Sequence, residues 1–144
     1  MEEHQLHYLD KFSLAGRRAL VTGSSRGIGF GIAEALAGAG AEIILNGRNQ
    51  ETLGSAAARL AEAGATVKAL AFDVTSEESV EDAIAYAESE IGPIDILVNN
   101  AGIQHRSPLE DFPLEKFRQV MDTNLTSAFI VGRAVARGMI ARRH

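Results

Sequence analysis

Four short apolar runs alternate with helical patterns along this chain, and this alternation is the feature that most limits its fold. The expected strands cover residues 17–22, 42–46, 66–72 and 94–98, and the expected helices cover residues 27–39, 49–63, 75–91 and 114–140. Strands separated by helices of about 10–15 residues pair in parallel through right-handed crossovers, with helices on both faces of the sheet. The sequence therefore predicts an α/β domain with a doubly wound parallel sheet.

Polar residues mark where two of these helices should begin. Asn49 can cap the second helix, because its side chain can accept a bond from a free backbone N–H group of the first turn. Thr75 and Glu78 have the spacing of a capping box at the start of the third helix. We expect both helices to start at these positions.

The first strand leads into a glycine-rich turn, residues 22–29, with the sequence TGSSRGIG. We expect Gly23 to allow a sharp turn, Gly27 to leave room for a pyrophosphate, and Gly29 to let the next helix pack close to the strand. The N–H groups and the positive end of that helix would then face the phosphates. Three glycines alone are also compatible with an ordinary strand-to-helix turn.

Composition excludes several classes of function. The 144 residues suit one domain, and 46% hydrophobic with 23% charged residues indicates a globular protein. A net charge of -5 argues against a nucleic-acid or anionic-membrane partner. The chain has no cysteine and no His/Asp/Glu cluster with metal-ligand spacing, so we expect no metal site. It has no apolar run of about 20 residues, and residues 1–5 do not resemble a signal peptide, so we expect a cytoplasmic protein.

Several motifs occur in an order that is specific to one family. The glycine-rich turn is followed by Asp73-Val74 after the third strand, by the sequence NNAG at residues 99–102 after the fourth, and by Asn124 in the last helix. This set resembles the short-chain dehydrogenase/reductase family over nearly the whole chain. Within that family, residues 12–14, 45–49, 99–106 and 131–137 are similar to gluconate 5-dehydrogenases.

The resemblance implies a dinucleotide site with a Rossmann-type sheet. Residues of the glycine-rich turn would line the ribose and pyrophosphate, Asp73 and Val74 would contact the adenine, and the NNAG segment would follow the nicotinamide ribose. The expected cofactor-binding residues are Gly23, Ser25, Arg26, Gly27, Ile28, Gly29, Asn46, Arg48, Asp73, Val74, Asn100, Ala101 and Gly102. Taken singly, Asp73 could also be a carboxylate that stabilises the start of a helix, and Asn99-Asn100 could be an ordinary turn.

Charge favours NADP over NAD as the cofactor. An NAD enzyme usually places a carboxylate about 20 residues beyond the glycine-rich turn, on the ribose 2′-hydroxyl. Here that place holds Gly47, followed by Arg48, and Arg26 projects from the turn toward the same region. Two guanidinium groups without a carboxylate suit a 2′-phosphate, which arginine can bind with two parallel hydrogen bonds. The alternative is that both arginines are solvated surface charges.

The chain departs from the family at the catalytic residues. The family uses a Tyr-x-x-x-Lys pair as proton donor, with a serine that orients the carbonyl group. This sequence has only Tyr8 and Tyr86, and four residues later stand Phe12 and Glu90 rather than lysine. Of the family's catalytic residues only Asn124 is present, and the resemblance implies that it binds a water of the proton relay. A purely structural role is the alternative for Asn124.

Two further features bear on the substrate and the core. His105 and Arg106 follow the NNAG turn and could reach a substrate carboxylate, or they could belong to a surface loop. In the last helical region apolar residues recur at a spacing of three or four, which predicts a buried helix face. The residues of this face are Phe117, Met121, Leu125, Ala128, Val135 and Met139.

The resemblance therefore implies an NADP(H)-dependent oxidoreductase that interconverts hydroxyl and keto groups of a sugar acid, such as D-gluconate and 5-keto-D-gluconate, and that forms a homo-oligomer. We expect residues 1–144 to be a single, incomplete dinucleotide-binding domain with strand order 3-2-1-4, ending before a fifth strand and inactive by itself. The alternative is a non-catalytic protein that binds NADP or pairs with an intact subunit.

Overall fold

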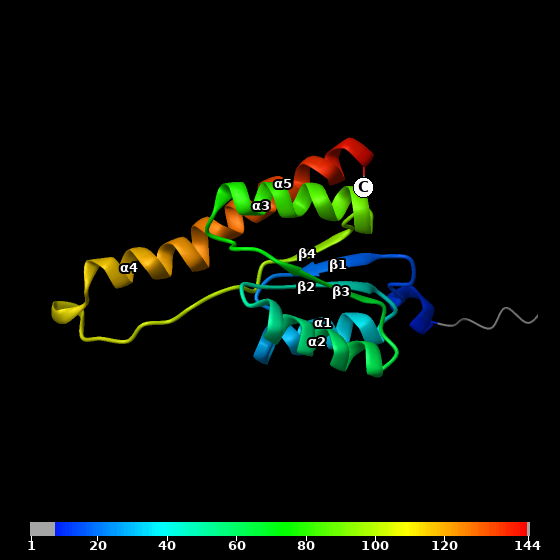
Figure 1. The fold of residues 1–144 in the computed structure, drawn as a ribbon, viewed down its shortest axis with the longest axis horizontal. Coiled ribbons are helices and arrows are strands. Elements are labelled where there is room, and N and C mark those ends of the chain that lie inside the picture. Colours follow the sequence, from blue (N-terminus) through cyan, green and yellow to red (C-terminus); the bar gives the residue numbers. More distant parts are fainter. Residues whose placement is uncertain (1–7, 144) are drawn as a thin grey trace, which may run out of the picture.

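The computed structural model describes residues 8–143, and in this range the chain forms one parallel sheet between two layers of helices (Figure 1). The strand order is β3-β2-β1-β4, with every neighbouring pair parallel. The strands are β1 Arg18–Val21, β2 Glu42–Gly47, β3 Val67–Ala71 and β4 Ile96–Val98. The predicted α/β fold and its strand order are confirmed. Residues 1–5, on which the expected absence of a signal peptide rests, lie outside the described residues.

Helices cover both faces of this sheet. The first two, α1 (Gly27–Gly38) and α2 (Gln50–Glu62), lie on one face, whereas α3 (Glu77–Tyr86) and α5 (Ser127–Arg142) lie on the other (Figure 1). Within residues 8–143 the chain also has one shorter α-helix, α4, and four helical turns, of which η2 and η4 are of the wide π type. The bounds are η1 Tyr8–Phe12, η2 Ala87–Ile91, η3 Leu109–Asp111, α4 Leu114–Met121 and η4 Asp122–Thr126.

The core has two parts because successive strand residues point to opposite faces of the sheet. In β1, Ala19 and Val21 pack in the part formed with α1 and α2, whereas Leu20 packs in the part formed with α3 and α5. All three side chains are fully buried. Strands covered on both faces need apolar residues at every position, which explains why the sequence shows continuous apolar runs rather than alternation.

One of the two predicted helix caps is confirmed and the other is wrong. The backbone N–H of Thr52 donates to Asn49 Oδ1 at 2.9 Å, so Asn49 caps α2. Helix α3 is capped by Ser76, whose Oγ accepts from the Ser79 N–H at 3.3 Å, and not by Thr75. Thr75 instead donates to Asp73, and this local turn shifts the helix start by one residue.

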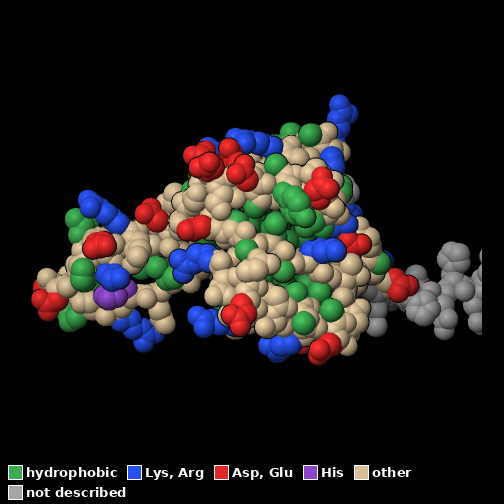
Figure 2. Space-filling view, in the orientation of Figure 1, with side chains coloured by type: hydrophobic (Ala, Val, Ile, Leu, Met, Phe, Trp, Pro, Cys, Tyr) green, Lys and Arg blue, Asp and Glu red, His purple; other side chains and the backbone are tan. Residues whose placement is uncertain are grey.

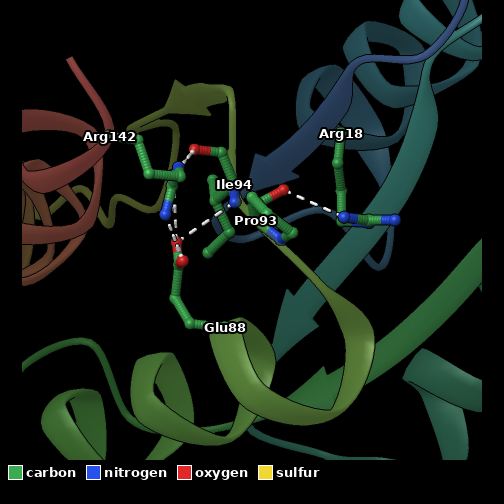
Figure 3. A network of polar contacts seen from close by, with 5 residues as sticks. All are labelled: Arg18, Glu88, Pro93, Ile94 and Arg142. Carbon is green, nitrogen blue, oxygen red and sulfur yellow. Dashed lines mark hydrogen bonds and ion pairs between the residues drawn. The ribbon is translucent and has the colours of Figure 1, made fainter. Parts of the chain in front are cut away.

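Ion pairs and hydrogen bonds fix the approach to β4 (Figure 3). Glu88 at the end of the third helical region accepts bonds from Arg142 and, at 3.1 Å, from the Ile94 N–H group. Arg142 also donates to the Ile94 carbonyl oxygen at 2.9 Å, and Arg18 donates to the Pro93 carbonyl oxygen at 3.0 Å. These contacts hold the segment before β4 from both sides, so the strand pairs with β1 in a fixed register.

The last helical region does not form a single buried helix face, so that prediction is wrong for its first half. Helix α4 and the wide turn η4 project away from the sheet before α5 packs onto it (Figure 1). Of the predicted face, Phe117, Met121 and Leu125 are 51%, 38% and 61% exposed, whereas Val135 in α5 is buried. The periodic pattern is the same in both halves, but only the second half lies over the sheet.

Candidate functional site

The predicted site residues gather at the carboxyl edge of the sheet. The glycine-rich turn follows β1, Arg48 follows β2, Asp73 follows β3, and the NNAG segment follows β4. Because the strands are parallel, all four segments leave the sheet at the same edge. This edge is where ligands bind in open α/β sheets.

The glycine-rich turn has the backbone that its sequence predicts. Gly23 has a φ angle of +61°, which is costly for other residues, and a Cβ placed on it would lie 2.8 Å from Ala101 Cα. A Cβ on Gly29 would overlap the Gly23 carbonyl oxygen and the Asn100 side chain. The turn therefore packs directly against the segment after β4, and α1 starts close to the sheet with its N-terminus at this edge.

Buried polar side chains support the turn from below. Asn46 is 1% exposed, and its Oδ1 accepts from the Gly23 N–H at 3.2 Å while its Nδ2 donates to the carbonyl oxygens of Leu70 and Phe72. Ser24 Oγ donates to the Val21 carbonyl oxygen at 2.7 Å. The structure thus places Asn46 beneath the turn, where its polar atoms are already bonded within the protein.

Thr22 joins the turn to the NNAG segment. Its Oγ1 accepts from the N–H groups of Asn100 and Ala101, each at 3.0 Å. In return, Asn100 Nδ2 donates to the carbonyl oxygens of Thr22 and Gly23, also at 3.0 Å. The Asn100 side chain is therefore used to fix the geometry of the site, while Ala101 and Gly102 remain at its border.

A basic hollow opens beside the turn. This cavity has a volume of about 940 Å³, and we call it the basic hollow because three arginines line it. Its lining residues are Ser25, Arg26, Arg48, Asn49, Glu51, Thr52, Ser55, Ala56 and Arg59. In the space-filling view, basic side chains lie along the edge of the body that faces the projecting α4 arm (Figure 2). The structure thus brings the two predicted arginines to one cavity.

Asp73 lies next to this hollow and is held as a carboxylate. Its Oδ1 accepts from the Thr75 N–H at 2.9 Å and from Thr75 Oγ1 at 2.7 Å. These two bonds lower the pKa of the Asp73 carboxyl group, and the positive charge of Arg48 lowers it further. Val74 beside it is buried. Both bonds end on Oδ1, so the geometry allows Oδ2 to accept a bond from a ligand.

Asn124 connects the loop after β4 to the last helical region. It lies in the wide turn η4, where its Oδ1 accepts from the Ile103 N–H at 2.8 Å and its Nδ2 donates to the Ile103 carbonyl oxygen at 2.9 Å. His105 packs edge-on against Phe112, with ring centroids 5.3 Å apart, and Arg106 is exposed. Neither His105 nor Arg106 lines the basic hollow.

Sequence reasoning missed several residues of this site. Thr22 and Ser24 lie inside the glycine-rich motif, but their hydrogen bonds to distant strands leave no signal in the local sequence. The sequence predicts Asn49 only as a helix cap, whereas in the structure it also lines the basic hollow. Arg48 precedes α2, whereas Arg59 lies in the third turn of that helix. Only the packing of α2 against the glycine-rich turn reveals that both arginines line one cavity.

A comparison with known protein families identifies the chain. Residues 17–144 match the model of the short chain dehydrogenase family. The chain therefore belongs to the short-chain dehydrogenase/reductase family, as the order of its motifs predicts.

Two curated relatives of the chain have names that contain a sugar acid. The chain is 53% identical to a gluconate 5-dehydrogenase of Gluconobacter oxydans over 92% of its own length and 52% of the relative. It is 43% identical to a 5-keto-D-gluconate 5-reductase of Escherichia coli, over 93% and 53% of the two chains. The chain spans about half the length of these curated relatives.

A solved structure agrees with the fold. A gluconate 5-dehydrogenase from Burkholderia cenocepacia, in complex with NADP and tartrate, matches with a TM-score of 0.93 and 49% identity, covering 96% of this chain and 54% of that one.

Between residues 8 and 143 no helix is long and apolar enough to cross a membrane. In the same part of the chain, no three His, Asp or Glu residues form a group that could hold a metal ion.

Proposed function

We propose that the chain is the NADP(H)-binding part of an oxidoreductase that interconverts hydroxyl and keto groups of a sugar acid. The observation that carries this proposal is the pair of guanidinium groups, Arg26 and Arg48, in one hollow beside the glycine-rich turn. NAD enzymes usually have a carboxylate at the end of this strand, and that carboxylate would repel a 2′-phosphate. Here strand β2 ends at Gly47, which has no side chain. The bound nucleotide would supply or accept the hydride.

Each part of the site has a role in this proposal. The N-terminus of α1 and the backbone of residues 23–29, including Ser25, Gly27 and the 79% exposed Ile28, would bind the pyrophosphate and ribose. Asp73 would accept a bond from the adenine amino group while Val74 supports the ring. Ala101 and Gly102 would border the nicotinamide ribose. For Asn46 and Asn100 we propose positioning roles, because their side-chain atoms already bond to the turn.

The substrate proposal rests on the relatives. Gluconate and 5-keto-D-gluconate appear in the names of the two relatives above, and tartrate is another hydroxy acid in the neighbouring structure. His105 and Arg106 are exposed on the loop after β4 and are the proposed contacts for a substrate carboxylate. Asn124 would bind a water molecule near this loop, although in the structure its amide bonds to Ile103.

We propose that the 144-residue chain binds the nucleotide without turning over the substrate. Tyr86 is the one tyrosine whose side chain the structure describes, and it lies at the end of α3. Helix α3 runs opposite to the strands, so its end lies at the sheet edge away from the site.

The alternative function is a non-catalytic NADP-binding protein that associates with other subunits. The exposed apolar residues of α4 favour this alternative.

The test is a calorimetric titration of the chain with NADP and with NAD. We expect tighter binding of NADP, and Arg26→Ala with Arg48→Ala should remove about 1–2 kcal/mol of that preference, since solvent screens exposed cations. Gly47→Asp should shift the preference toward NAD. A Cβ at position 47 would lie 3.6 Å from Leu53 Cδ1 and 3.7 Å from Ser25 Oγ, so the fold can accommodate it. Equal affinity of the unchanged chain for both nucleotides would contradict the proposal.

A further inference from the structure

The basic hollow contains a third guanidinium group besides those of Arg26 and Arg48. Its wall on α2 is formed by Thr52, Ser55, Ala56 and Arg59, which are spaced by three, one and three residues and so share one face of the helix. Side chains on a helix point back toward its N-terminus. The long side chain of Arg59 therefore extends toward the end of α2 where Arg48 lies.

An aromatic ring orients this guanidinium. The Cζ atom of Arg59 lies 4.3 Å from the centroid of the Phe30 ring. Phe30 is buried in the first turn of α1, directly after the glycine-rich turn. Stacking on the ring face keeps the planar guanidinium in place while its N–H groups still point outward from its edge. The ring thus orients a cation beside the predicted phosphate site.

The charges around the hollow favour a doubly charged anion. Three arginines and one carboxylate, Glu51, line it, although the whole chain has a net charge of -5. None of the ion pairs formed among residues 8–143 involves Arg59. A local excess of positive charge in an acidic protein attracts and orients an anionic ligand group.

We propose that Arg59 is a specificity-determining residue that contributes a third cation for the 2′-phosphate of NADP and that Phe30 positions it. This inference rests on the proposed function, in which the basic hollow receives the adenosine end of the nucleotide. It goes beyond the pair of arginines that follow the turn and β2, because Arg59 belongs to the third turn of a neighbouring helix.

The experiment titrates NADP and NAD into the 144-residue chain and into three variants. Arg59→Gln should weaken NADP binding roughly three- to tenfold and change NAD binding by less than about twofold, since NAD lacks the 2′-phosphate. The loss should shrink when NaCl rises from about 0.05 M to about 0.5 M. Phe30→Leu should act in the same direction but more weakly. Arg118→Gln, which removes an equal charge from the exposed surface of α4, should leave both affinities unchanged.

The outcomes separate this inference from the proposed function. If the unchanged chain shows no preference for NADP, the proposed function fails together with this inference. If the preference exists and Arg59→Gln behaves like Arg118→Gln, only the role of Arg59 is overturned. Equal weakening of NADP and NAD by Arg59→Gln, in a variant whose thermal unfolding is unchanged, would also overturn the specificity role, because it would place Arg59 at the shared part of the nucleotides.

Discussion

Replacing Gly29 by alanine tests the close packing on which the whole site depends. A Cβ at this position would overlap the Gly23 carbonyl oxygen, and Gly23 has little room to move toward Ala101, since a Cβ built on Gly23 would lie only 2.8 Å from the Ala101 Cα. Overlap with a backbone atom, which cannot rotate away, should cost about 2–3 kcal/mol, the upper part of the range for overpacking. Alanine favours a helix over glycine by about 1 kcal/mol, which offsets part of this cost. We expect Gly29→Ala to lower the free energy of unfolding by about 1–2 kcal/mol.

Gly31→Ala is the matched control. It lies two residues further along α1, and a Cβ there would meet no atom within 4 Å. The same substitution should therefore stabilise the chain by about 0.5–1 kcal/mol. Thermal unfolding by circular dichroism should show a melting temperature roughly 3–8 °C lower for Gly29→Ala and roughly 2–4 °C higher for Gly31→Ala. Similar increases for both variants would refute the close approach of α1 to the sheet.

Three further outcomes are expected. The pKa of Asp73 is lowered in the folded chain, so its carboxylate stabilises the fold above the pKa of the unfolded chain, and this contribution is lost as the pH falls through the folded value. Urea unfolding between about pH 6 and pH 3 should thus show a smaller loss of stability for Asp73→Asn than for the unchanged chain. The exposed row with Phe117, Leu125 and Phe129, together with the edge strand β4, should cause self-association, and sedimentation velocity should show less of it in Leu125→Glu. Absorbance of NADPH should stay constant with 5-keto-D-gluconate present, and turnover that persists through further purification would show another proton donor.

The sequence predicts those features that depend on local pattern. The alternation of apolar runs and helices predicts a parallel sheet with helices on both faces, and the spacing of Gly23 and Gly29 predicts the sharp turn and the close helix. The strand order is what the resemblance to the family implies. Asn49 caps α2 as expected because a cap is decided within one helical turn. The same reasoning fails at Thr75, because its side chain turns back to donate to Asp73 and Ser76 provides the oxygen that caps α3.

Features that depend on distant contacts could not be predicted. The apolar residues of α4 have the same spacing as those of α5, and only the path of the chain decides that Phe117 is exposed and Val135 buried. Asn46 looks like a possible ligand contact in the sequence, whereas its hydrogen bonds to Leu70 in β3 and to Phe72 directly after that strand place it beneath the turn. Arg59 joins the basic hollow through packing between helices.

The most direct test of the account is a nuclear magnetic resonance titration of the labelled chain with NADP and with NAD. The account predicts that both nucleotides shift the amide signals of residues 23–29, Val74 and residues 101–102. It also predicts that the difference between the two nucleotides is concentrated at Arg26, Arg48 and their neighbours in the basic hollow. Shifts confined to α4, or identical shifts for both nucleotides around the hollow, would contradict it.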